Sequence, residues 1–256
     1  MRNLLRSALS LLATLAIKKH KIRVAVILGQ SGSDMVKEIL YTVLKEKENV
    51  RRNIEDIWWD LSVPLNILGY DDKQRNIASW LKLLFNATVA LIKNRSNPHL
   101  IILNADTGNE NTAKYWSKFL KPEYTILLDY FEDNTLYNLL SIRTAEVGGK
   151  VILKDNLDLP IKKQITNKSL FTYGGKNSNL QIETQKVSNI KLKYKKQTIT
   201  LPKKLWPAIS MRITGSIFAL GILEGHRLDE IAFSCLKYTF PKNMLRRIKS
   251  NLLNFA

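Results

Sequence analysis

Val24-Ala-Val-Ile-Leu-Gly-Gln-Ser-Gly-Ser-Asp-Met-Val-Lys-Glu38 is the stretch that decides the fold of this 256-residue chain. Its first five residues are all apolar, which is typical of a strand buried on both faces of a sheet. Two glycines and two serines follow within Gly29–Asp34 and predict a tight turn, and Met35 begins a segment with helical spacing. We therefore expect a central strand over Val24–Leu28, a loop at its carboxyl end and then a helix.

The turn Gly29–Asp34 is similar to a phosphate-binding loop, but it lacks the residues that such a loop needs. A Gly-x-x-Gly-Lys-[Ser/Thr] loop holds phosphates with backbone N–H groups and a helix N-terminus, while its lysine reaches the outer phosphates and its hydroxyl binds Mg²⁺. Ser33 and Asp34 stand in the lysine and hydroxyl positions. A carboxylate at Asp34 is stabilised by the helix dipole and repels an anion.

We therefore expect a vestigial nucleotide loop that is empty of nucleotide and needs no cofactor. Its residues are Gly29, Gln30, Ser31, Gly32, Ser33 and Asp34. Lys37 lies about one helical turn past Ser33, so it is a weak candidate for a replacement catalytic lysine. The favoured interpretation is that Lys37 caps or solvates the helix.

Strand and helix patterns alternate along the first two-thirds of the chain and predict an α/β fold with a mostly parallel central sheet and helices on both faces. Predicted strands are Val24–Leu28, His99–Asn104, Tyr124–Asp129 and Lys150–Leu153. An extended segment broken by Pro64 is expected at Leu61–Leu68. Predicted helices are Met35–Lys47, Ile77–Ile92, Glu110–Leu120, Thr135–Val147, Trp206–Leu223 and Leu228–Tyr238. A small antiparallel sheet is expected near residues 170–201. Ligands of such folds bind beyond the carboxyl ends of the strands, where Gly29–Asp34, Asn104–Gly108 and Asp129–Asn134 are expected to converge.

The net charge of +18 is unevenly distributed. Residues 1–23 carry 6 basic and no acidic residues, residues 24–139 carry 13 and 15, and residues 140–256 carry 21 and 7, giving +6, −2 and +14. Such basic ends favour anionic partners. The candidate anion-binding lysines near Tyr194 and Trp206 are Lys191, Lys193, Lys195, Lys196, Lys203 and Lys204. Basic residues between aromatic rings suit single-stranded nucleic acid, which is the least favoured partner because no nucleic-acid motif accompanies them.

Two domains are predicted: a basic amphipathic helix within residues 1–23, and one domain over residues 24–256. The apolar stripe of the helix is expected at Leu4, Leu5, Ala8, Leu12 and Leu15. The apolar run Ser7–Ile17 is too short for a membrane span. It either packs on the domain, which we favour, or binds an anionic membrane surface. One cysteine, Cys235, excludes an internal disulfide and fits the cytoplasm, and three scattered histidines make no zinc site.

Several segments together resemble the central ATPase domain of the Mur ligase family over about residues 22–250, most closely the members that add D-alanyl-D-alanine to the UDP-N-acetylmuramoyl tripeptide. The resemblance rests on Gly29–Glu38, Val63-Pro-Leu-Asn-Ile-Leu68, Lys121-Pro-Glu-Tyr-Thr-Ile126, Phe171-Thr-Tyr-Gly174, Leu220-Gly-Ile222 and Leu228-Asp-Glu-Ile231. The resemblance implies a P-loop-like fold and an ancestry in ATP-dependent amide formation, in which phosphorylation activates a carboxylate.

The residues that this chemistry requires are replaced. Counting from Lys121-Pro122 puts Asn104 at the family's metal-binding Glu and Asn134 near its His. The family's paired asparagines before Val-Pro-Leu fall at Trp58-Trp59. An amide holds Mg²⁺ more weakly than a carboxylate, so no metal is expected. No lysine lies between Lys121 and Lys150 to serve as the family's carbamylated residue. The family's first and last domains, which bring the UDP-sugar and the amino acid, are also expected to be missing.

Three hypotheses follow from these observations. The favoured one is a pseudoenzyme that acts as a binding or regulatory module in peptidoglycan precursor synthesis, in the cytoplasm or at the membrane periphery, with an intact Mur ligase or another cell-wall enzyme as partner. The first alternative is an ATP- and Mg²⁺-dependent carboxylate–amine ligase that works with domains from another chain. The second is binding of nucleic acid or an anionic surface by the basic carboxy-terminal part.

Overall fold

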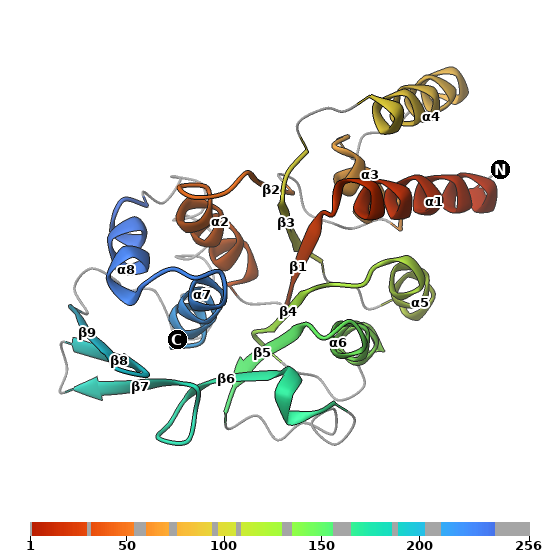
Figure 1. Ribbon diagram of the computed structural model, residues 1–256. Helices are drawn as coiled ribbons and strands as arrows, with labels where there is room; N and C mark the ends of the chain where they lie inside the picture. The colour runs from red at the N-terminus through yellow and green to blue at the C-terminus, as the bar shows by residue number, and fades with distance from the viewer. Residues whose placement is uncertain are drawn as a thin grey trace, which may run out of the picture.

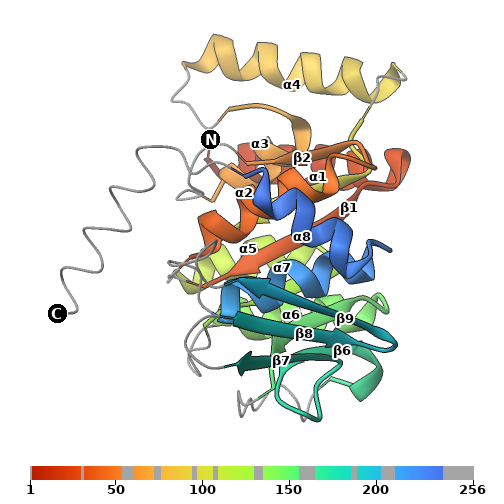
Figure 2. The same ribbon diagram turned by 90° about the vertical axis from the view of Figure 1, so that its left-hand side faces the viewer.

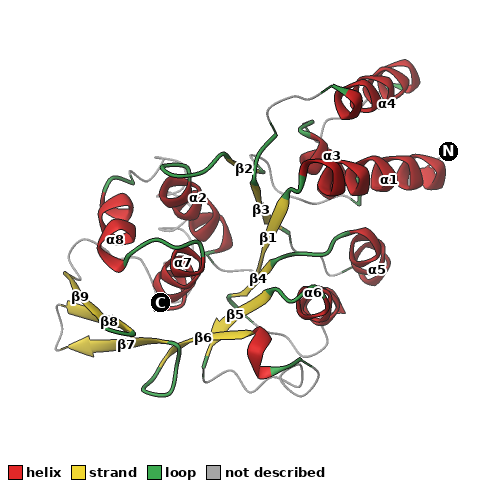
Figure 3. Cartoon of the chain, viewed as in Figure 1, coloured by secondary structure: helices red, strands yellow, loops and turns green. Residues whose placement is uncertain are grey.

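The computed structural model describes residues 2–29, 32–53, 60–71, 76–93, 97–105, 109–129, 135–155, 165–185, 189–202 and 211–238. Within these residues one nine-stranded sheet has the order β2-β3-β1-β4-β5-β6-β7-β8-β9 (Figure 1). The strands are β1 (Arg23–Leu28), β2 (Val50–Arg52), β3 (Leu100–Asn104), β4 (Tyr124–Leu127), β5 (Lys150–Lys154), β6 (Leu170–Gly174), β7 (Leu180–Gln185), β8 (Asn189–Tyr194) and β9 (Gln197–Pro202). The helices in Figure 3 are α1 (Arg2–His20), α2 (Ser33–Leu44), α3 (Ser62–Leu68), α4 (Ile77–Ile92), α5 (Glu110–Phe119), α6 (Thr135–Glu146), α7 (Met211–Leu223) and α8 (Leu228–Leu236), with a 3-10 turn η2 (Asn167–Ser169).

The sheet is parallel from β2 to β7 and antiparallel from β7 to β9. This confirms the predicted α/β class. The strand over Val24–Leu28 lies inside the sheet, because β1 pairs with β3 on one side and β4 on the other. The antiparallel strands extend this same sheet instead of forming a separate one, and β6 runs parallel to β7. The sequence interpretation had missed β2, which is three residues long.

Helices cover both faces of the parallel sheet because the strand residues alternate between two apolar clusters. Ala25 and Ile27 of β1 join the cluster formed with α2, α7 and α8. Val24, Val26 and Leu28 join the cluster formed with α1, α3, α5 and α6 on the opposite face. Figure 1 shows these two helical layers on either side of the strands, and Figure 2 shows α4 outside them.

Helix α1 packs on the domain, as the favoured interpretation predicts, but the predicted stripe is not its most buried side. Leu9, Ala13 and Ala16 are the buried residues, while Leu4 and Leu15 are 78% and 45% exposed. The buried stripe contacts α3, α4 and α5, so the position of these neighbours sets which side of the helix is covered. Sequence spacing alone fits both stripes because leucines occur on each.

The prediction of an extended segment at Leu61–Leu68, broken by Pro64, is wrong: Ser62–Leu68 is helix α3. Pro64 is the third residue of the helix, where an N–H group has no acceptor within the helix. A proline is tolerated in this first turn. Gly69 then ends the helix in the left-handed conformation at φ 83°.

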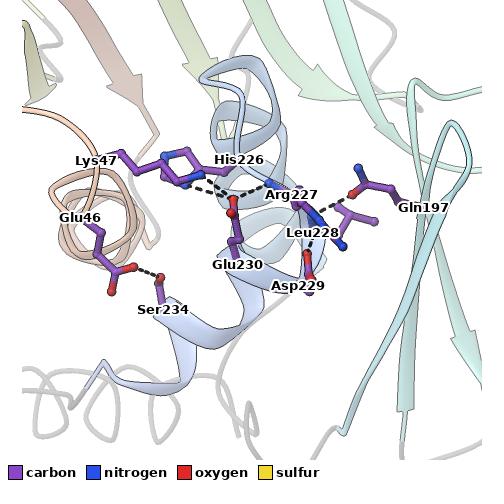
Figure 4. A network of polar contacts seen from close by, with 9 residues as sticks. All are labelled: Glu46, Lys47, Gln197, His226, Arg227, Leu228, Asp229, Glu230 and Ser234. Carbon is purple, nitrogen blue, oxygen red and sulfur yellow. Dashed lines mark hydrogen bonds and ion pairs between the residues drawn. The ribbon is translucent and has the colours of Figure 1, made fainter.

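A polar network fixes α8 against the turn that follows α2 and against the β8–β9 hairpin (Figure 4). Glu230 Oε2 accepts hydrogen bonds from Lys47 Nζ at 2.7 Å and from the Arg227 backbone N–H at 2.9 Å. The other contacts are Ser234 Oγ to Glu46 Oε2 at 2.9 Å and Leu228 N to Gln197 Oε1 at 3.1 Å. These bonds bring α8 to a turn that lies 188 residues earlier in the chain.

Candidate functional site: the loop after the first strand

Two glycines shape the loop between β1 and α2. Gly29 has φ 144°, and a Cβ there would lie 2.8 Å from Leu128 Cβ at the end of β4. Gly32 has φ 85° at the N-cap of α2, and its Cβ would lie 2.7 Å from Ile213 Cδ1 of α7. Both positions therefore favour glycine for conformation, and at Gly29 the neighbouring Leu128 Cβ also leaves no space for a side chain. Gln30 and Ser31 lie outside the described residues.

Asp34 occupies the first turn of α2, and its carboxylate is engaged within the protein. Its Oδ1 accepts a hydrogen bond from Asn104 Nδ2 at 2.8 Å and an ion-pair contact from Lys37 Nζ at 3.1 Å. The negative charge also lies at the positive end of the helix dipole. The Asp34 side chain is 36% exposed, so it borders the solvent.

Lys37 is buried at 3% exposure, so the interpretation that it solvates the helix is wrong. It lies three residues after Asp34 on the same face of α2, where side chains at this spacing meet. Ser33, in the position of the family's lysine, is also buried, at 7% exposure. The helix after the loop thus contributes a buried cation, Lys37, and its charge is balanced by Asp34.

The site is completed from two neighbouring strands. Asn104, at the end of β3, donates its backbone N–H to Asn53 Oδ1 at 2.8 Å, and Asn53 is fully buried just after β2. Asp129, just after β4, forms an ion pair with Arg212 of α7. The predicted convergence of the three strand ends is therefore found for the described residues. Asn134 and Trp58-Trp59 lie outside them.

Sequence reasoning missed Asn53 and Arg212. Asn53 follows a strand too short to give a periodic pattern, so its position in the sheet is not visible in the sequence. Arg212 is one of many basic residues in the second half of the chain, and no local motif distinguishes it.

Around the loop, Asp34 forms an ion pair with Lys37, and Asp129 forms one with Arg212. Phosphate binding requires cations or N–H groups that are available to the ligand. In the described part of the chain, no group of three or more His, Cys, Asp or Glu residues is placed to hold a metal ion. A cavity of about 720 Å³ lies between α1 and α5, and none of its lining residues comes from this loop.

The candidate anion-binding lysines lie elsewhere, on the antiparallel hairpin, separated from β1 in the sheet by β4, β5, β6 and β7. Lys191 and Lys193 alternate with the core residues Ile190 and Leu192, so they face outward. Tyr194 packs on the core side, with its ring centroid 6.2 Å from that of Phe171.

The remaining lysines of this group divide between the turn and the undescribed residues. Lys195 and Lys196 form the β8–β9 turn, and Lys195 Nζ lies 5.2 Å from the centroid of the Tyr194 ring. Lys203, Lys204 and Trp206 lie outside the described residues. The hairpin therefore exposes lysines, but the aromatic ring next to them, that of Tyr194, packs against the core.

Comparison with protein-family models gives no match, and a search of curated proteins gives none either. Solved structures do match. MurF from Acinetobacter baumannii matches with a TM-score of 0.65 and 16% identity, over 94% of this chain and 51% of that chain. MurF ligase from Thermotoga maritima in complex with ADP matches with a TM-score of 0.60 and 14% identity, over 91% and 53%.

A third structure, a pseudomurein peptide ligase type C from Methanothermus fervidus, matches with a TM-score of 0.52 and 12% identity, over 86% and 50%. The chain thus spans about half the length of these proteins. The strand, loop and helix around Gly29–Asp34 lie within the region that matches these structures. Over the 91–94% of its length that matches the two MurF structures, the chain has the fold of the Mur ligases.

Proposed function

We propose that this chain is a catalytically degenerate Mur-ligase-like protein that acts as a binding or regulatory module linked to peptidoglycan precursor synthesis. The proposal rests on one observation: the carboxylate of Asp34 lies in the first turn of α2, held by Lys37 and Asn104. An internal anion thus takes up the cation and the helix N-terminus that a nucleotide phosphate would use.

The same arrangement opposes both ATP and its metal. A phosphate beside Asp34 would add negative charge next to a carboxylate at the edge of a low-dielectric interior. Asn104, at the end of β3, offers only a neutral amide, and its Nδ2 is already donated to Asp34. Losing the loop lysine and the charged metal ligands removes charge-assisted hydrogen bonds worth about 1.5–3 kcal/mol each. We therefore expect nucleotide binding to be lost and no cofactor to be required.

Calorimetric titration with ATP and Mg²⁺ tests this proposal. The natural chain is expected to release no binding heat, while the double variant Ser33→Lys with Asp34→Thr is expected to gain measurable affinity. Two restored contacts correspond to a gain of about 100-fold or more. The matched control is Glu110→Thr with Asn111→Lys, which makes the same charge change in the first turn of α5.

Micromolar binding of ATP by the natural chain would refute the proposal. A gain of affinity in the control variant as large as in the loop variant would assign the binding to net charge and not to the loop. If neither variant binds, the backbone of the loop does not form a phosphate cradle, and the idea of a vestigial nucleotide site is wrong.

The competing function is an ATP-dependent carboxylate–amine ligase that works with domains from another chain. The buried position of Lys37 favours keeping this candidate, because a lysine already lies on the helix that follows the loop. Its ammonium would have to leave Asp34 to meet a phosphate. Nucleotide turnover that disappears in Lys37→Met, with the fold retained, would establish this candidate and refute the degenerate one.

The partner proposed for the regulatory role is an intact Mur ligase or another cell-wall enzyme. The purified chain, added in increasing amounts to a purified D-alanyl-D-alanine-adding ligase, is expected to change the rate of amide formation saturably. An unchanged rate, together with no binding in sedimentation, would contradict this part of the proposal and leave the nucleotide result unaffected.

A further inference from the structure

Helix α4 exposes several large apolar side chains to solvent. Only Leu83 and Ala87 of its sixteen residues are buried. Its exposed stripe consists of Ile77, Leu81, Phe85 and Ile92, which are 61%, 63%, 69% and 73% exposed. These residues recur at helical spacing and therefore form one continuous apolar face.

Helix α1 lies beside α4 and presents a second apolar stripe. Leu4, Leu11 and Leu15 are 78%, 60% and 45% exposed, on a different side from the buried Leu9. The two helices are in contact through the cluster of Leu9, Leu65 and Leu83. Lys19 Nζ also donates to the Leu91 carbonyl oxygen near the end of α4. Figures 1 and 2 both show α4 at the outer edge of the molecule, whereas α1 belongs to the helical layer that covers the sheet.

The charged residues within the helices of this surface have one sign, and the nearest described exposed carboxylate in the chain after α3 is Asp71. Helices α1, α3 and α4 contain no acidic residue. Lys18, Lys21, Lys82 and Lys93 are exposed around the apolar stripes. Asp60, just before α3, is 4% exposed and paired with Arg2 and Arg6.

We propose that the exposed face of α1 and α4 docks on an anionic lipid bilayer. Aliphatic and aromatic side chains flanked by lysines, with no acidic residue among them, match the boundary between acyl chains and negatively charged headgroups. The charge complementarity favours a lipid surface over a second copy of this chain, whose identical face would bring lysines against lysines. None of the described helices combines the length and apolarity of a membrane span, so docking would be peripheral. The packing and membrane alternatives for residues 1–23 are thereby combined, since one side of α1 packs and another faces the lipid.

Cosedimentation of the full chain with vesicles tests the proposal. Vesicles of equal parts phosphatidylglycerol and phosphatidylcholine are expected to bind the chain in low salt and release it in high salt, while phosphatidylcholine alone binds weakly. The apolar variant is Leu81→Ser with Phe85→Ser, and its matched control is Phe233→Ser with Leu236→Ser on α8, where the side chains are 60% and 47% exposed. The first pair is expected to weaken binding by at least about tenfold and the control by less than about twofold.

A second pair of variants tests the charge. Lys82→Glu with Lys93→Glu replaces two cations by anions, one within α4 and one at its C-terminal end. Lys193→Glu with Lys195→Glu makes the same charge change on the antiparallel hairpin. One cation near an anionic bilayer adds about fivefold in affinity, so the first pair is expected to weaken binding by about 25-fold or more. All these side chains are exposed, and circular dichroism verifies that each variant is folded.

Three results would overturn the proposal. The first is vesicle binding that is unchanged in both the apolar and the charge variants of α4. The second is an equal loss in the α8 or hairpin controls, which would assign the binding to net charge or to another surface. The third is a dimer, seen by sedimentation velocity without lipid, that dissociates in the Leu81/Phe85 variant, because the face would then belong to a second copy. Because ATP titration does not involve this face, its outcome leaves the proposal unaffected.

Discussion

Removing the two partners of the Asp34–Lys37 ion pair should have unequal effects on stability. Asp34→Ala leaves the Lys37 ammonium, whose side chain is 4% exposed, without its anionic partner. Breaking a buried pair in this way destabilises a protein by about 3–5 kcal/mol, and the 36% exposure of Asp34 reduces the expected effect to about 1–3 kcal/mol. The lost acceptor of Asn104 and the lost charge at the helix N-terminus add about 1 kcal/mol together, giving about 2–4 kcal/mol in total.

Lys37→Met removes the buried charge and keeps most of the side-chain volume. Asp34 then remains hydrated, still accepts from Asn104 and still lies at the helix N-terminus. We therefore expect a loss of only about 0–1 kcal/mol. The double variant should be more stable than Asp34→Ala alone, with a coupling of about 1–2 kcal/mol.

Urea denaturation followed by circular dichroism measures the free energy of unfolding of the three variants. The control is Glu110→Ala, which breaks the exposed Glu110–Lys114 pair in the first turn of α5 and should change stability by no more than about 0.5 kcal/mol. The reasoning is refuted if Lys37→Met is as destabilising as Asp34→Ala, or if the two single effects simply add in the double variant.

Three further predictions concern the packing and the pH dependence of stability. Gly215→Ala should destabilise by about 1–3 kcal/mol, because the added Cβ would lie 2.1 Å from Cδ2 of the buried Tyr173 ring; a neutral result in urea denaturation would contradict this. Leu9→Ala, at a fully buried position of α1, should lower the free energy of unfolding by about 2–5 kcal/mol. Leu4→Ala, on the exposed side of α1, should change it by no more than about 0.5 kcal/mol. Equal effects of the two substitutions would show that α1 is not packed as described. Burial lowers the pKa of His226, so the unfolded chain binds the proton at a higher pH than the folded chain. Stability should therefore fall as the pH drops below about 6.5 toward the pKa of the folded state. His226→Gln should remove this part of the pH dependence in thermal denaturation between neutral pH and a pH of about 5, and an unchanged profile would contradict the prediction.

Much of the sheet follows from local sequence. The apolar runs in β1, β3, β4 and β5 are buried on both faces, and such runs leave few alternatives to a parallel sheet covered by helices. The errors occur where tertiary structure decides between locally equivalent options. Pro64 fits an extended segment as well as the first turn of a helix, and only its neighbours select α3. In the same way, the side of α1 that is buried depends on where α3 and α4 lie.

The sequence predicts where the candidate site lies, but it does not predict most of the side-chain contacts within it. Glycine spacing after an apolar strand locates the loop, and the carboxyl ends of parallel strands bring Asn104 to Asp34. The burial of Lys37 follows from the direction of α2 against the sheet, which helical spacing alone does not give. Asn53 and Arg212 reach the site through a three-residue strand and a distant helix, and neither leaves a periodic signal in the sequence.

The contact of α7 and α8 with α2 has a consequence for how the chain is synthesised. The apolar cluster on the α2 face takes residues from both the first 50 and the last 50 positions, and the Arg23–Glu224 hydrogen bond joins residues 201 positions apart. At a translation rate of about 5–20 residues per second, α2 waits about 10–40 seconds on the ribosome before its covering helices emerge. During that interval its apolar face is open to chaperones and to other nascent chains. A chain that stops before α7 should therefore aggregate, whereas the 256-residue chain buries the surface in a late, long-range step.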